Sequence, residues 1–171
     1  MTPFIKFLKR VGAQPYVVIG ALTAALLLAS FFALYGQALQ ESKERFRLIS
    51  TQALDAIIMM DHTGAISFWN PAAETMFGYT RQEALGKDLH QLLAPSVYHE
   101  EFRRGFMQFQ KTGEGQALGR LIELRALRKD GTEFPIELSV SPASLGEQWY
   151  SIGILRDITE RKNTQEALAR Q

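Results

Sequence analysis

The chain carries few residues able to perform covalent or metal chemistry. It has three histidines, His62, His90 and His99, and no cysteine. The lack of cysteine excludes disulfides, thiolate metal sites and a cysteinyl adduct to a chromophore. The sequence pattern places His62 in a turn and His90 on a short helix, so neither forms a metal cluster with His99. Because the sequence also has no P-loop, no local Ser/His/Asp motif and no ATP-binding boxes, we predict that it is not an enzyme.

Composition indicates one globular domain with an appendage. Of 171 residues, 46% are apolar and 22% are charged, which is typical of a folded chain rather than a disordered one. Lys and Arg number 19 against 18 Asp and Glu, giving a net charge of +1. This balance provides no large field to attract a polyanion, so we expect no nucleic-acid partner.

The hydrophobic residues are concentrated near the N-terminus. The run YVVIGALTAALLLASFFALY, residues 16–35, has no charge and as a helix would span about 30 Å, the thickness of a bilayer core. We therefore predict a tail over 1–15 and a transmembrane helix over 16–36. A signal peptide is the alternative, but its apolar region is usually only about 7–15 residues long. Basic residues flank both ends equally, so charge does not decide the orientation.

The elements that follow predict an α+β domain. Residues 37–55 lack Gly and Pro and favour a connecting helix; an amphipathic helix that covers the domain is the equal alternative. Two short apolar runs then flank Asp61-His62-Thr63-Gly64, a pattern typical of a hairpin. Short capped helices come next, and a longer one is expected from Ser96 to about Thr112. From Ala117 onward, alternating and turn-separated segments predict three antiparallel strands, followed by a last helix from Thr159.

Three blocks of sequence carry a family resemblance. They are DHTGAISFWNPAAETMFGYTRQEALGKDLHQLLAP, RKDGTEFPIELSVSP and GILRDITERK. In this order they resemble a PAS domain of the S-box type, as found in bacterial membrane-anchored sensor proteins. The resemblance implies five antiparallel strands with helices on one face over residues 56–158, and an exit helix over 159–171 that carries the signal.

PAS domains often hold a small molecule between sheet and helices. The apolar residues of the predicted strands and helices are the candidates to line such a pocket, and a fully packed core is the alternative. They are Ile57, Met59, Ile66, Phe68, Phe77, Phe102, Phe106, Leu124, Ile136, Leu138, Ile152 and Ile154.

No cofactor is specified by the sequence. Flavin bound without an adduct would leave no short motif to test. The segment APSVYHEEFRRGFMQFQKTGE resembles the haem-binding helix of oxygen-sensing PAS kinases of the FixL type, but Phe102 occupies their ligand position and Ile122 their arginine position. His99, three residues before Phe102, is a weak alternative ligand.

The resemblance also assigns signal coupling and partners. Asp157, Ile158 and Thr159 match the triad that couples the last strand to the exit helix, and Asp157 or Thr159 can cap that helix. Pairing through the N-terminal helix makes Phe46, Ile49 and Ala53 candidates for a homodimer interface. We expect a single-pass protein of the bacterial inner membrane, with its PAS domain in the cytoplasm. It would act on a kinase or cyclase output domain or a partner protein, or serve as a ligand-free docking module.

Overall fold

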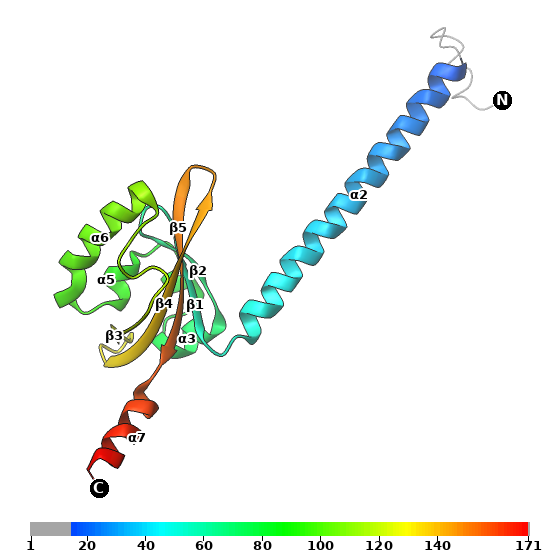
Figure 1. Cartoon of the computed structure of the whole chain (residues 1–171). Coiled ribbons are helices and arrows are strands. Elements are labelled where there is room, and N and C mark those ends of the chain that lie inside the picture. The colour runs from blue at the N-terminus through cyan, green and yellow to red at the C-terminus, as the bar shows by residue number, and fades with distance from the viewer. Residues whose placement is uncertain (1–14, 171) are drawn as a thin grey trace. The chain divides into compact units, whose positions relative to one another are not determined.

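A computed structural model describes residues 15–170. The chain divides into two compact units at Arg47 and Leu48, and each is considered by itself. The described part of the first unit is helical, whereas the second contains a sheet and several helices (Figure 1).

Helix α2, Pro15–Gln52, supplies the described part of the first unit and continues into the second. The stretch 19–52 has a mean hydropathy of 1.9 in its most apolar window, and none of that window is buried, so it is long and apolar enough to cross a membrane. The polar part that follows is supported by ion pairs one turn apart, from Arg45 to Glu41 and from Arg47 to Glu44.

A five-stranded antiparallel sheet forms the second unit, in the order β2-β1-β5-β4-β3. Its strands are β1 Ala56–Met60, β2 Ile66–Trp69, β3 Leu121–Leu127, β4 Glu133–Leu145 and β5 Gln148–Asp157. Strand β5 lies in the centre and pairs with both β1 and β4, although it is the last strand in the chain. This arrangement confirms the predicted antiparallel α+β fold.

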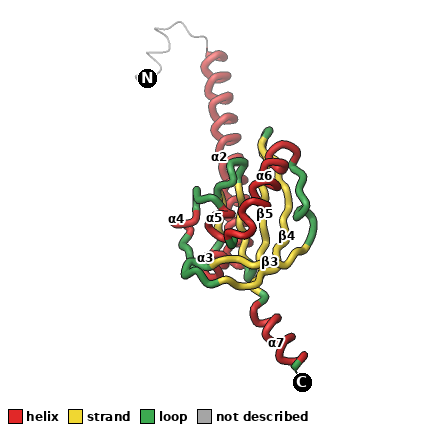
Figure 2. The backbone as a smooth tube through the Cα atoms, turned by 90° about the vertical axis from the view of Figure 1, so that its left-hand side faces the viewer, coloured by secondary structure: helices red, strands yellow, loops and turns green. Residues whose placement is uncertain are grey.

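Helices connect the two halves of the sheet and cover one of its faces (Figure 2). They are α3 Pro71–Phe77, α4 Arg81–Ala84, α5 Leu89–Leu93 and α6 His99–Thr112, and the last is preceded by a 3₁₀ turn, Ser96–Tyr98. Side-chain caps explain where the short ones begin: Asn70 starts α3, Thr80 forms a capping box with Glu83 on α4, and Asp88 starts α5. Hydrogen bonds from Lys129 and Thr80 lower the pKa of Glu83 to about 2.

The core lies between α3 and the sheet. Phe77 on α3 contacts Trp69 of β2 and Phe134 of β4, with ring centroids 5.5 and 5.6 Å apart, and all three residues are buried. Such tilted and edge-to-face contacts are favourable arrangements for aromatic rings. Helix α7, Thr159–Ala169, has no buried residue and leaves the sheet directly after β5.

Candidate functional site

A cavity of about 800 Å³ lies between the inner face of the sheet and helices α5 and α6. This volume is within the range usual for small-molecule sites. Its apolar lining comes from the two helices, the loop before β3 and all strands except β2. The main members are Ile58, Met60, Leu89, Leu93, Phe102, Phe106, Phe109, Leu118, Ile122, Leu124, Ile136, Leu138, Val140 and Leu155.

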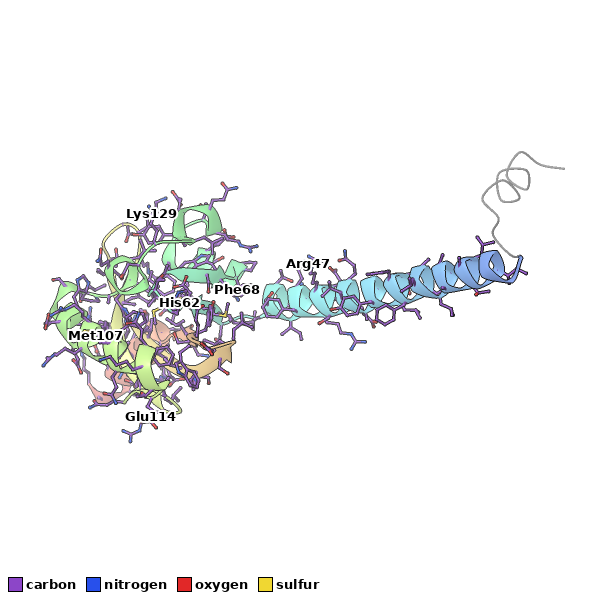
Figure 3. The ribbon with its side chains drawn as sticks, turned by 90° about the horizontal axis from the view of Figure 1, so that it is seen from above. Arg47, His62, Phe68, Met107, Glu114 and Lys129 are labelled. Carbon is purple, nitrogen blue, oxygen red and sulfur yellow. The ribbon has the colours of Figure 1, made fainter. Side chains whose placement is uncertain are left out.

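Helix α6 forms one wall of the cavity. Phe102, Phe106 and Phe109 follow one another at spacings of four and three, which places them on the same face of the helix. Met107 lies on the outward side and is 46% exposed (Figure 3). The helix ends at Gly113, whose φ of 68° favours glycine, and a Cβ there would lie 2.5 Å from the Trp149 ring. The end of α6 is thus fitted closely against β5.

The structure separates the twelve predicted pocket residues into three groups. Phe102, Phe106, Leu124, Ile136 and Leu138 line the cavity. Ile66 and Phe77 belong to the packed core instead, with 1% and 0% exposure. The prediction is wrong for the remaining five, which lie on the opposite, outer face of the sheet: Ile57, Met59, Phe68, Ile152 and Ile154.

Strand pairing explains this correction. Directly opposed residues of antiparallel strands share a face, and Ile57 opposes Ile154 while Met59 opposes both Ile152 and Phe68. The other parity of β1 is buried and includes the lining residues Ile58 and Met60. Because every residue of AIIMM is apolar, hydrophobicity could not show which parity faces inward.

The least exposed polar side chains of the cavity are uncharged or held neutral. His90 stacks on Phe102 at 4.8 Å between ring centroids, and Tyr98 and Ser151 also line the wall. Burial lowers the pKa of His90, the neighbouring His99 lowers it further, and Asp88 opposes the shift. The imidazole is therefore neutral at pH 7.

His99 does not face the cavity. Its Nε2 lies 2.8 Å from the carbonyl oxygen of Ala94, and it is not among the lining residues. Phe102 occupies the position that the resemblance to oxygen-sensing PAS kinases assigns to the iron ligand, so these side chains do not fit haem ligation from α6. Within residues 15–170 there is also no group of three metal-ligating side chains.

The second part of the site is the junction between β5 and α7. Asp157 ends β5, and its Oδ1 accepts a hydrogen bond from the backbone N–H of Thr159 at 2.8 Å, while Oδ2 is bound by Arg128. Arg128 also stacks on Phe134 at 3.6 Å and donates to the carbonyl oxygen of Met76 on α3. Burial by itself would raise the pKa of Asp157, but hydrogen bonds from Thr159 and Arg128 outweigh it and lower the pKa.

The other two residues of the predicted triad have distinct positions. Ile158 is 2% exposed and anchors the junction, with its N–H donating to the carbonyl oxygen of Pro135. The Thr159 hydroxyl is buried and has no hydrogen-bond partner in the described part of the chain. Ile158 occupies the N-cap position of α7, and the Asp157 side chain, one residue earlier, binds the N–H of the first helical residue, Thr159.

Ion pairs on the outer face also hold α7. Arg161 binds Glu123 of β3 at 2.7 Å and Glu137 of β4 at 2.9 Å, and Lys162 binds Glu123 as well. The hydrogen bond from Lys162 lowers the pKa of Glu123 against a smaller effect of burial. Glu123 lies between two cavity-lining residues, Ile122 and Leu124, so one strand contacts the cavity on one face and α7 on the other.

Asn70 fixes the N-terminal junction of the domain, a role that sequence reasoning missed. Its side chain is 1% exposed; Oδ1 accepts from the N–H groups of Ile57 and Ala73, and Nδ2 donates to the carbonyl oxygens of Ser50 and Asp55. From the sequence, Asn70-Pro71 predicted only the N-terminal cap of α3.

The end of β5 also contacts the N-terminal junction. Arg156 binds both carboxylate oxygens of Asp55 at 2.9 and 2.7 Å. Adjacent residues of one strand therefore hold the segment that enters the domain and the helix that leaves it. The proposed dimer residues precede this point: Phe46 and Ile49 are 58% and 70% exposed, and Ala53 is half-buried.

An antiparallel sheet whose helix-covered face lines an apolar cavity, and whose last strand passes straight into a helix, defines an α+β domain with a ligand-sized cavity beside its exit helix. The sequence pattern of the PAS domain matches residues 54–160, more than half of the chain, so the chain belongs to the PAS domain family. The PAS domain of a Colwellia psychrerythraea protein, solved by crystallography, is similar with a TM-score of 0.57 and 27% identity, covering 72% of this chain and 98% of that one.

Curated relatives are much longer than this chain. An uncharacterized protein of Azorhizobium caulinodans is 36% identical over 94% of this chain and 21% of its own length. The sensor protein FixL of Bradyrhizobium diazoefficiens is 30% identical over 77% of this chain and 26% of its own length. The chain thus spans about a fifth to a quarter of these relatives.

Proposed function

We propose that the chain is the membrane-anchored sensory part of a bacterial signalling protein. In this proposal, residues 16–36 cross the membrane, 37–55 connect, 56–158 form a cytoplasmic sensory domain, and 159–171 carry its signal to an output domain or partner. The apolar, unburied stretch of α2 supports the anchor. The similarity to FixL and to the signal transduction histidine-protein kinase AtoS of Escherichia coli supports a kinase as the output.

One observation carries the proposal: β5 joins the cavity to the exit helix. Ser151, Gly153 and Leu155 of this strand line the cavity, and two residues later Asp157 holds the first turn of α7. A ligand that shifts β5 or β3 displaces residues that hold α7, because Asp157 of β5 and Glu123 of β3 bind that helix directly. Packed interfaces convert such small shifts into a change between discrete arrangements.

Hydrogen exchange on the full chain in lipid nanodiscs tests this coupling. Ile122→Phe enlarges a side chain on the cavity wall, and Leu121→Phe, on the 66% exposed neighbour, is the matched control. We expect faster exchange at the amide of Lys162, which donates to the carbonyl oxygen of Ile158, in the first variant only, because a displaced β3 weakens its ion pairs with α7. Equal exchange in both variants would show that the cavity does not communicate with α7.

A second function is favoured by the outer face of the sheet. Ile57, Met59, Ile152 and Ile154 place apolar side chains side by side on β1 and β5, and Ile154 is 47% exposed. We propose that a second copy of the chain covers this patch. Ile154→Asp should then lower the dimer fraction in light scattering of the detergent-solubilised chain; an unchanged fraction refutes pairing through this face.

A further inference from the structure

We infer that the entry segment of the domain, residues 53–55 between α2 and β1, controls how firmly α7 is docked on the sheet. When Asp55 is withdrawn, Arg156 turns to Glu137 and competes with α7 for that carboxylate. This exchange of partners gives α7 a second input, which bypasses the cavity. The inference rests on the proposed function only in taking α7 as the helix that carries the signal.

Two glutamates on the outer face of the sheet create a site for a cation. Glu123 of β3 lies directly opposite Glu137 of β4, and each lies between residues that line the cavity on the inner face. Like charges directly opposite one another on a sheet are destabilising. Arg161 of α7 offsets this repulsion by binding both carboxylates, at 2.7 and 2.9 Å. The helix is therefore attached where the sheet itself requires positive charge.

Ionic contacts attach α7 to the sheet after its first residue, Thr159. The helix has no buried residue, and the Arg161 and Glu123 side chains of its contact with β3 are 43% and 47% exposed. Exposed ion pairs of this kind are weak, so they are readily exchanged. An isolated helix of 11 residues is also marginal in water, so the protection of the α7 amides depends on its docking.

A second cation lies beside the same glutamates. Arg156 of β5 is directly opposite Glu137, and opposed Cβ atoms on a sheet are about 4.5–5.5 Å apart, within the reach of an arginine. Its guanidinium is bound instead by both carboxylate oxygens of Asp55, at 2.9 and 2.7 Å. The hydrogen bonds and charge of Asp55 raise the pKa of Arg156, and the charge of Glu137 raises it further. Both carboxylates thus act on one guanidinium.

Glu137 is the carboxylate for which the two arginines compete. Its side chain is only 15% exposed and already accepts a hydrogen bond from Arg161. While Asp55 holds Arg156, Glu137 is left to Arg161. Once Asp55 releases it, a second guanidinium approaches the same carboxylate, and the repulsion between the two like charges weakens the hold on α7. The buried Ile158 keeps the base of the helix in place while its docking loosens.

A double-mutant cycle on the full chain in lipid nanodiscs tests the inference, with hydrogen exchange at Lys162 and the α7 amides after it as the readout. Asp55→Ala should speed this exchange by about two- to fivefold, the range that one exposed ion pair provides. Arg156→Gln removes the competing cation, so in that background Asp55→Ala should not change the exchange of α7. Glu100→Ala is the matched control: it frees Arg103 from an exposed 2.8 Å ion pair on α6, and it should leave α7 unchanged.

The junction around Asn70 shows whether Asp55→Ala leaves the fold intact. The amides of Ile57 and Ala73, which donate to Asn70, should keep their wild-type exchange. If they do not, Asp55→Asn, which retains the size of the side chain, takes its place and should also speed the exchange of α7. The inference is overturned if α7 exchange is unchanged in the Asp55 variant, or if it rises equally with and without Arg156.

The cavity variant Ile122→Phe separates this inference from the sensory proposal. Faster exchange of α7 in Ile122→Phe but not in Asp55→Ala would overturn the inference alone. The reverse result would support the inference and remove the cavity from the proposed function. The two routes to α7 are thus tested by different substitutions on the same readout.

Discussion

Replacing Asn70 by Ala should be one of the most destabilising single changes in the domain. The substitution removes an N-cap, worth about 1 kcal/mol, and leaves two N–H groups and two carbonyl oxygens without their partner. A buried group without a partner costs about 1–3 kcal/mol, and some of these groups will find water. We therefore expect a loss of about 3–5 kcal/mol in the free energy of unfolding.

Urea denaturation of the full chain in nanodiscs, followed by far-UV circular dichroism, measures this loss. Asp88→Ala is the matched control, because Asp88 is also an N-cap, accepting from the N–H of Gln91 at 2.8 Å, but makes this bond at an exposed site. It should cost only about 1 kcal/mol. If Asn70→Ala costs no more than Asp88→Ala, the four hydrogen bonds do not form the junction described above.

Three further outcomes are expected. Gly113→Ala should destabilise the domain by about 2 kcal/mol more than Gly146→Ala in the same denaturation assay, because both strain a positive φ but only the first drives a Cβ into Trp149. Glu83→Gln should reduce stability above pH 4.5, and the difference from wild type should vanish as the pH falls toward about 2, since the lowered pKa makes the carboxylate stabilising only while it is ionised. His90→Phe should abolish a loss of stability that wild type shows as the pH falls below about 6.5, where protonation favours the unfolded chain.

A specific result would contradict each of these three predictions. Equal losses for the two glycine variants would mean that α6 does not end against Trp149. A difference for Glu83→Gln that persists unchanged at pH 2 would contradict its lowered pKa. A wild-type stability that stays constant from pH 7 to pH 5, or that rises in that interval, would contradict a neutral His90.

The sequence predicted those features that local patterns determine. Helix caps, the glycine that ends α6 and the order of helices and strands along the chain all follow from residues near one another in the sequence. On β3, polar and apolar residues alternate, so Leu124 was assigned to the correct face. On β1 and β5 both parities are apolar, and five pocket residues were placed on the wrong face for that reason.

Long-range side-chain contacts could not be predicted in this way. Arg128 reaches Asp157 across 29 positions and Asn70 reaches Ser50 across 20, and neither spacing has a periodicity that would reveal it. The sequence did point to Asp157, as one of two residues able to bind the start of the exit helix, because its partner lies only two residues away. The sequence therefore predicted the local contact of the exit junction, but not the long-range contacts of Arg128 and Asn70.

The most direct test of the central claim is a distance measurement across the exit junction. Because the chain has no cysteine, spin labels can be attached at Leu145→Cys on β4 and Leu168→Cys on α7, which are 70% and 66% exposed. Pulsed electron resonance on the chain in nanodiscs should give one narrow distance distribution. Asp157→Ala should broaden or shift it, whereas Asp130→Ala, which removes an equivalent 2.8 Å turn hydrogen bond to Thr132, should not. An unchanged distribution in Asp157→Ala would contradict the claim that this junction holds α7 in place.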